Sequence, residues 1–161
     1  MPRRLLRNGE VVTDEWRYLG EPEAAADSAL ILTFDQWASD REQWLARGGR
    51  LGVILGPAHR VEFLAPDLPH LDLVGADFPN PSEGRGYTQG RLLRERWKFA
   101  GELRATGHVR RDHLFFLARC GFNSFELPDS EIESASSAVS TFSVCYQPAN
   151  DLGLQVKLRH R

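Results

Sequence analysis

Cysteine is scarce in this sequence, and long apolar runs are missing. The 161 residues include two cysteines, Cys120 and Cys145, which lie far apart and form no Cys-x-x-Cys pair. A disulfide scaffold, a zinc knuckle and a cysteine-ligated iron–sulfur site within the chain are therefore excluded, and a cytoplasmic location is expected. No stretch approaches the roughly 18 apolar residues of a membrane helix, and no apolar run follows the first arginines, so neither membrane insertion nor export is expected.

The chain also lacks a large excess of charge of one sign. It has 20 Lys and Arg against 22 Asp and Glu, a formal net charge of −2. This balance excludes a globally basic nucleic-acid binder, and no aromatic ladder lies in the basic part of the chain to stack on single-stranded bases. With 42% hydrophobic residues, the composition is that of one ordinary globular domain.

Common catalytic and cofactor motifs are missing as well. The five histidines show no His-x-His or His-Glu-x-x-His spacing, and there is no Gly-x-Ser-x-Gly elbow or P-loop. Gly84-x-Gly86-x-x-x-Gly90 departs from the dinucleotide-binding fingerprint, and no acidic residue follows at the end of the next strand. We therefore expect no metal, no flavin and no nicotinamide cofactor.

The order of elements predicts an α/β fold. Asn8-Gly9 between two short apolar stretches predicts a β-hairpin. Five strands, each followed by a helical segment, are then expected at 30–34, 51–55, 73–78, 102–106 and 123–127. Because parallel strands need crossover connections, this order indicates a mainly parallel sheet. We expect one domain over residues 1–147, with a hairpin extension at 1–19, a short stretch at 143–147 and a loosely held tail at 148–161.

The later strands alternate in polarity, which bears on the shape of the sheet. One face collects the polar side chains of Asp77, Glu102, Arg104, Thr106, Ser124 and Glu126. A flat, doubly wound sheet with helices on both faces should be apolar on both. The pattern therefore favours an incomplete (β/α) barrel with an open, polar concave side, and the flat sheet is the alternative.

The segment from Gly84 to Arg119 is strongly basic, with eight arginines and one lysine against three acidic residues. A glycine-rich loop before a helix offers free backbone N–H groups, and an arginine beside it can hold an oxyanion such as sulfate, sulfite or phosphate. The competing interpretation is a solvated helix face with a simple turn before it. The candidate anion ligands are Arg85, Gly86, Tyr87, Arg91, Arg104 and Arg111.

The strand ends carry further candidates. We expect Arg85 and Arg104 to converge on one anion, unless Arg104 pairs internally with Asp77 or Glu126. The catalytic candidates His108, Asp77 and Glu126 lie where ligands of parallel α/β sheets usually bind. The simpler interpretation of His108 is a turn residue.

Several short blocks form a specific pattern along most of the chain. They are Asn8-Gly9-Glu10, Asp14-Glu-Trp16, Gly84-Arg-Gly-Tyr87, Arg91-Leu-Leu-Arg-Glu-Arg96, Gly101-Glu-Leu-Arg-Ala105 and Arg119-Cys-Gly-Phe122. Together they resemble the bacterial domain-of-unknown-function 934 family, although Gly90 and Asn123 stand where Ala and Asp are common. The resemblance implies a protein encoded beside assimilatory sulfite reductase and labelled a probable oxidoreductase of sulfite reduction, without an established mechanism.

We therefore expect an accessory protein of sulfate or sulfite assimilation that holds an oxyanion at the Gly-Arg-Gly loop. A small enzyme acting on a sulfur or phosphate metabolite is one alternative. The other is a non-catalytic module whose basic face docks an acidic sulfite reductase or electron carrier. A homodimer is also expected, because a short sheet leaves an exposed edge and Phe115-Phe116 is an apolar pair.

Overall fold

The computed structural model describes residues 3–22, 24 and 27–141. The strands are β1 (Arg4–Arg7), β2 (Glu10–Thr13), β3 (Trp16–Tyr18), β4 (Ala29–Thr33), β5 (Leu51–Leu55), β6 (Leu73–Phe78), β7 (Glu102–Gly107) and β8 (Ser124–Phe125). The α-helices are α1 (Phe34–Ser39), α2 (Arg41–Arg47), α3 (Val61–Leu64), α4 (Arg85–Glu95), α5 (Leu114–Arg119) and α6 (Asp129–Thr141). Short 3-10 helices occupy Ala65–His70 and Arg111–His113.

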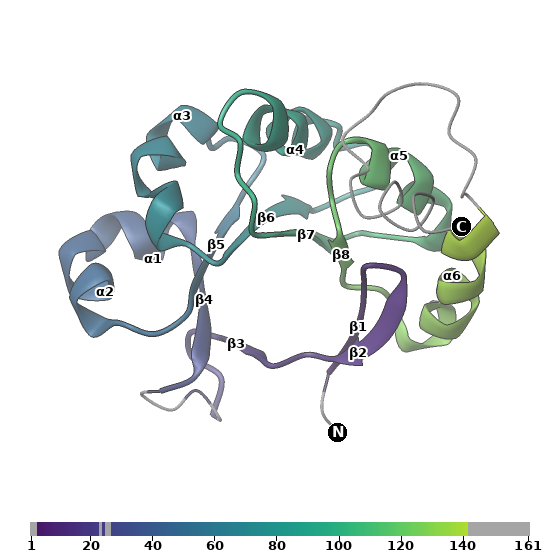
Figure 1. Cartoon of the computed structure of the whole chain (residues 1–161), viewed down its shortest axis with the longest axis horizontal. Coiled ribbons are helices and arrows are strands. Elements are labelled where there is room, and N and C mark those ends of the chain that lie inside the picture. Colours follow the sequence, from purple (N-terminus) through teal and green to yellow (C-terminus); the bar gives the residue numbers. More distant parts are fainter. Residues whose placement is uncertain (1–2, 23, 25–26, 142–161) are drawn as a thin grey trace, which may run out of the picture.

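All the strands belong to one sheet in the order β2-β1-β8-β7-β6-β5-β4-β3. Strands β3 to β8 run parallel to one another, whereas β1 pairs antiparallel with both β2 and β8. The sheet curls into a half-barrel with the helices on its outer side (Figure 1). The predicted α/β fold is confirmed, and of the two predicted shapes the structure has the incomplete barrel.

The N-terminal hairpin forms at the predicted turn. Asn8 and Gly9 adopt φ values of 53° and 83°, the left-handed conformation that a tight hairpin turn requires. The hairpin is part of the main sheet, because β1 pairs with β8. The chain then passes directly from β2 into β3, a strand that the sequence analysis did not separate from the hairpin extension and that pairs parallel with β4. The two outer strands of the curled sheet are thus consecutive in sequence.

The apolar core has two parts, one on each face of the sheet. The larger part lies on the convex side, where residues such as Leu103 and Ala105 of β7 face outward and pack beneath the helices. The smaller part lies on the concave side and consists of Trp16, Ile31, Ile54 and Leu73. The close packing of side chains on this side requires glycine at position 75, because a Cβ there would lie 2.2 Å from Cδ1 of Ile54.

Two predictions fall outside the described residues, namely the short stretch at 143–147 and the loosely held tail at 148–161. Within the described part, Cys120 is a free, half-buried thiol at the end of α5, and burial raises its pKa.

Candidate functional site

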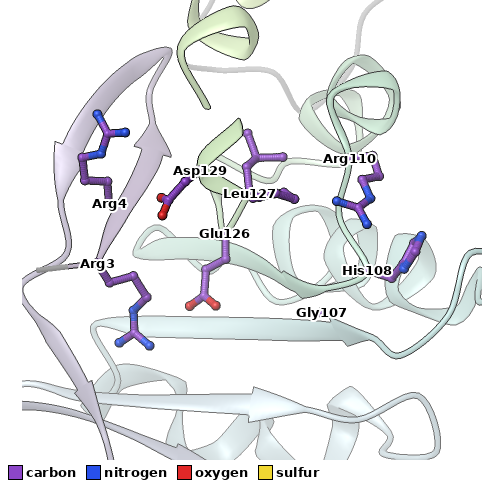
Figure 2. Close-up of a pocket in the computed structure, with 9 residues that line it drawn as sticks. Arg3, Arg4, Gly107, His108, Arg110, Glu126, Leu127 and Asp129 are labelled. Carbon is purple, nitrogen blue, oxygen red and sulfur yellow. The ribbon is translucent and has the colours of Figure 1, made fainter. Parts of the chain in front are cut away.

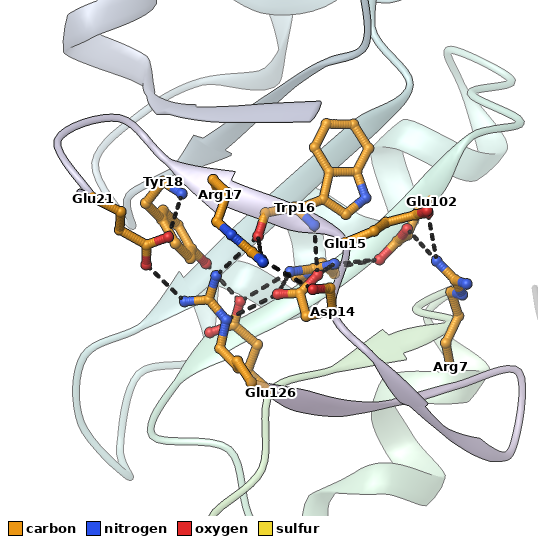
Figure 3. Close-up of polar contacts among 11 residues, drawn as sticks. Arg7, Asp14, Glu15, Trp16, Arg17, Tyr18, Glu21, Glu102 and Glu126 are labelled. Carbon is orange, nitrogen blue, oxygen red and sulfur yellow. Dashed lines mark hydrogen bonds and ion pairs between the residues drawn. The ribbon is translucent and has the colours of Figure 1, made fainter. Parts of the chain in front are cut away.

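The polar face of the later strands lines the concave side of the half-barrel, and its centre is Arg104. The side chain of this β7 residue is fully buried. Its guanidinium binds Asp14 through both terminal nitrogens, each at 3.0 Å, and also donates to Glu102. Asp14 lies in the two-residue link between β2 and β3, which closes over the concave face (Figure 3). The predicted open and wet face is therefore covered by the chain's own N-terminal segment.

Glu126, which directly follows β8, connects this network to the edge of the barrel. Its Oε1 accepts a hydrogen bond from the Tyr18 hydroxyl at 2.6 Å and another from Arg104 at 3.1 Å. Its backbone N–H donates to the carbonyl of Ala105, which fixes the residue beside β7. Of the partners that the sequence analysis offered Arg104, the structure therefore selects Glu126 and adds Asp14 and Glu102.

The network sets the protonation of its members. Burial alone would raise the pKa of Asp14, but the hydrogen bonds and positive charge of Arg104 outweigh burial and hold that pKa below its usual value. Burial and the negative charge of Glu126 raise the pKa of Tyr18, so the hydroxyl stays protonated and donates to the carboxylate. Arg104 remains positively charged, because its three acidic partners outweigh the effect of burial and raise its pKa.

A pocket of about 440 Å³ opens beside this network, at the carboxyl ends of β7 and β8 (Figure 2). We call it the β7–β8 pocket. It is lined by Arg3, Arg4, Gly107, His108, Arg110, Glu126, Leu127, Pro128 and Asp129. Three arginines outnumber two carboxylates in this lining. The carboxyl ends of parallel strands are where (β/α) barrels usually bind ligands, because the loops that follow the strands converge there.

Two of the three catalytic candidates from the sequence meet in the β7–β8 pocket. His108 enters it from the loop after β7 and Glu126 from the end of β8. The third candidate, Asp77, lies at the end of β6, where its Oδ1 accepts a hydrogen bond from Thr106 at 3.2 Å. Asp77 is not among the residues that line the pocket.

The polar lining of the β7–β8 pocket includes hydrogen-bonding groups without a partner among the described residues. Among the described residues, Arg4 binds Glu133 through Nη1 alone, at 2.7 Å, and Arg110 makes an ion pair with Glu131 through Nη1, at 3.6 Å, which is too long for a hydrogen bond. The His108 imidazole has no such partner in the described part of the chain, and Glu126 uses only Oε1. The pocket therefore offers several N–H donors and one half-buried carboxylate oxygen, Oε2 of Glu126.

The structure does not gather the six predicted anion ligands at the Gly-Arg-Gly loop. The Arg85 side chain is 65% exposed and forms two hydrogen bonds with Glu83, whereas Arg104 is buried inside the barrel. The expected convergence of Arg85 and Arg104 on one anion is therefore wrong. The physical reason is that each guanidinium already has its own carboxylate partners.

The remaining predicted ligands are dispersed along the chain. Gly86 is a packing residue, because a Cβ there would lie 2.5 Å from the Phe78 ring, which also packs edge-on against Tyr87. Arg91 makes an exposed ion pair with Glu95 in α4. Arg111 follows the pocket residue Arg110, and its backbone N–H donates to Glu131.

The basic segment also has an internal role that the charge count conceals. Arg94 donates hydrogen bonds to the backbone carbonyls of Phe99, Gly101 and Gly121, at 2.7 to 2.9 Å. It thereby ties α4 to the start of β7 and to the end of α5. Together with Arg104, it is a structural cation, so the outward-facing basic surface is smaller than the sequence suggested.

Sequence reasoning missed most of the residues around Glu126. Arg3, Arg4, Arg110, Tyr18 and Asp14 were not proposed as site residues, although all lie in the β7–β8 pocket or contact its network. The one available signal was an acidic residue, Asp14, placed directly between two apolar stretches.

Within the described part of the chain, no three His, Cys, Asp or Glu side chains are grouped to hold a metal ion, and no helix is long and apolar enough to cross a membrane.

Comparison of the chain with known proteins shows which family it belongs to. No curated protein matches the chain. A family model described as "Bacterial protein of unknown function (DUF934)" matches residues 52–154, a span that includes the basic segment, His108 and Glu126. The match covers more than half of the chain and confirms the resemblance of the central blocks, though it does not extend to the N-terminal ones. The chain therefore belongs to the bacterial family of unknown function DUF934.

Proposed function

We propose that this chain is a cytoplasmic accessory protein of bacterial sulfate or sulfite assimilation and that it binds a small oxyanion in the β7–β8 pocket. The assignment to sulfur assimilation rests on what the family resemblance implies. The observation that carries the binding site is that Arg4, Arg110 and His108 line one pocket, where Arg4 and Arg110 each face an acidic residue with Nη1 alone and keep their other N–H groups free of a described carboxylate. Such groups form the short, charge-assisted hydrogen bonds by which proteins hold oxyanions.

The test is calorimetric titration of the purified protein with sodium sulfite, sulfate and phosphate. Arg110→Ala should weaken binding by at least about tenfold, because one well-shielded charge-assisted hydrogen bond contributes roughly 1.5 to 3 kcal/mol. Arg85→Ala is the matched control, since it removes an arginine that is paired with Glu83 at the Gly-Arg-Gly loop. Its affinity should equal that of the parent protein. Failure of all three anions to bind, or equal weakening by both substitutions, would refute the proposal.

A small enzyme acting on a sulfur or phosphate metabolite is a second candidate, favoured by one observation. His108 and Glu126 line the same pocket, and Glu126 is oriented by Tyr18 and Arg104, as a general acid or base would need to be. Turnover of a sulfite adduct or phosphate ester that Glu126→Gln abolishes, while binding persists, would establish this activity. Binding without turnover would support the accessory role.

Docking of a sulfite reductase or an electron carrier through the basic segment is less well supported. Arg94 and Arg104 are internal, and Arg91 and Arg96 each have an acidic neighbour within 4 Å. The charge that remains on the outside is therefore partly neutralised. Exposed ion pairs of this kind are weak, so a strongly acidic partner could still displace them.

A further inference from the structure

We propose that Glu131 of α6 sets the affinity of the β7–β8 pocket for an anion, because it is an internal counter-ion that competes for Arg110. This inference rests on the proposed oxyanion site and adds a residue that controls it. The observation behind it is the position of the Glu131 carboxylate. It lies 3.6 Å from the guanidinium of Arg110, a residue that lines the pocket, and it is also bound to the backbone of the same loop.

The loop after β7 presents Arg110 from a fixed backbone position. Val109 is 1% exposed and anchors the loop in the core, and its two neighbours, His108 and Arg110, both line the pocket (Figure 2). The backbone N–H of Arg110 donates to Nδ1 of His113 at 3.3 Å. The Arg110 side chain is 44% exposed, so the backbone is held while the guanidinium retains access to solvent.

Glu131 contacts this loop with both of its carboxylate oxygens. Oε2 accepts a hydrogen bond from the backbone N–H of Arg111 at 2.9 Å, which fixes the carboxylate against the loop. Oε1 lies 3.6 Å from Nη1 of Arg110, within the range of an ion pair but beyond that of a hydrogen bond. Glu131 is not among the residues that line the pocket. Its negative charge is therefore held beside Arg110 from the side of α6.

The relative strengths of the two interactions decide which partner Arg110 takes. Charge-assisted hydrogen bonds between a guanidinium and an oxyanion are roughly twice as strong as neutral ones. A solvent-exposed ion pair contributes at most about fivefold to an equilibrium constant. An oxyanion in the pocket should therefore take Arg110, but its affinity is reduced by the loss of the pair with Glu131 and by repulsion from that carboxylate.

The arginine on the hairpin side of the pocket has a different kind of partner. Nη1 of Arg4 binds Glu133 at 2.7 Å, but the Glu133 side chain is 72% exposed. Glu133 makes no second hydrogen bond with a described residue, so no other contact in that part of the chain fixes its carboxylate. Glu133 can therefore turn into solvent when Arg4 meets an anion, whereas Glu131 stays beside Arg110.

Asp129 is the matched control for charge. It belongs to the same end of α6, is exposed and lines the pocket itself, but it makes no ion pair with a residue in the described ranges. Its charge acts on an anion only through solvent, where salt screens the repulsion. Separate substitution of Asp129 and Glu131 therefore distinguishes a general effect of charge from competition for Arg110.

The test is a double-mutant cycle, measured by calorimetric titration of the full chain with inorganic phosphate and with sulfite. Glu131→Gln should raise the affinity by about two- to fivefold. The glutamine keeps an oxygen for the backbone N–H of Arg111, so the loop stays held. In the Arg110→Ala background most of this gain should disappear, because no guanidinium is left to compete for. Asp129→Asn should have the same small effect in both backgrounds.

Each remaining outcome also decides. If Arg110→Ala binds too weakly to measure, a larger gain in Glu131→Gln than in Asp129→Asn supports the inference and an equal gain overturns it. Unchanged or weaker binding by Glu131→Gln, or an undiminished gain in the Arg110→Ala background, would overturn it while leaving the oxyanion site standing. A Glu131→Gln protein that does not fold would do the same, because the residue would then be structural. If neither the parent nor Glu131→Gln binds either anion, the proposed function itself fails. Binding by Glu131→Gln alone would support both.

Discussion

Replacing Arg104 with methionine should destabilise the protein by about 3 to 5 kcal/mol. The Arg104 side chain is fully buried and makes five hydrogen bonds to Asp14, Glu102 and Glu126. Methionine fills a similar volume but carries no charge, so the three carboxylates lose their common partner. The loss should therefore reflect buried charge left without compensation and not an empty cavity.

The structure places the expected value toward the lower end of this range. Asp14 keeps two other partners, the Arg3 guanidinium at 2.9 Å and the backbone N–H of Trp16 at 3.1 Å. Glu102 keeps Arg7 at 3.5 Å. By contrast, Arg91→Met removes an exposed ion pair with Glu95 and should cost less than about 1 kcal/mol.

The assay is urea-induced unfolding followed by fluorescence of the four tryptophans, one of which, Trp16, is buried on the concave side. Arg104→Met should shift the midpoint to much lower urea, and Arg91→Met should barely move it. Adding Asp14→Asn to Arg104→Met should restore part of the loss, because it removes an uncompensated charge. A change of less than about 1 kcal/mol in Arg104→Met alone would refute the view that this network holds the half-barrel together.

Further predictions concern pH, packing and self-association. Because the pKa of folded Asp14 lies below its unfolded value of about 4, its contribution to stability is complete above that value and is lost as the pH falls through the folded pKa. Asp14→Asn should flatten the acid side of a plot of urea midpoint against pH, and an unchanged slope would contradict the assignment. Gly75→Ala should cost about 1 to 3 kcal/mol through its clash with Cδ1 of Ile54, and the double variant with Ile54→Val should recover much of this cost in the same urea assay. Phe116 of α5 is 63% exposed, so its ring is available for the interface of the expected homodimer. Light scattering at micromolar concentration should give a dimer mass that Phe116→Ser reduces to the monomer, and a monomer for the parent protein would end that expectation.

Local sequence patterns determined the elements of this fold but not all of their boundaries. The apolar run at 51–55 coincides with β5, because a strand buried on both faces needs no polar interruption, and the segment 73–78, apolar except for Asp77, coincides with β6. The helix expected after β4 is divided at Asp40 into α1 and α2. Its N-cap is Thr33, whose hydroxyl accepts from the N–H of Gln36 at 3.2 Å, although Asp35, another common capping residue type, lies two positions later. Competing caps of similar energy, separated by two residues, cannot be ranked from sequence alone.

The alternation of polar residues along β7 also determined the shape of the sheet. Glu102, Arg104 and Thr106 share one face, and a sheet with one polar face cannot be covered by helices on both sides. The half-barrel follows from this period of two residues. The alternation of polar residues does not predict which residues contact Arg104 on the concave side.

Only the tertiary structure decided those contacts, because they join residues that are remote in sequence. Asp14 meets Arg104 because the link between β2 and β3 crosses the concave face, and no local pattern encodes that crossing. The partner of Arg85, in contrast, is Glu83, which lies only two residues away, so this pairing was predictable from the local sequence of the loop. The β7–β8 pocket likewise combines residues near 3, 108 and 126, which curling of the sheet brings together. Chemistry-bearing residues could be named from the sequence, but which of them share a site depends on the closure of the barrel, because a side chain's partners are set by its neighbours in space.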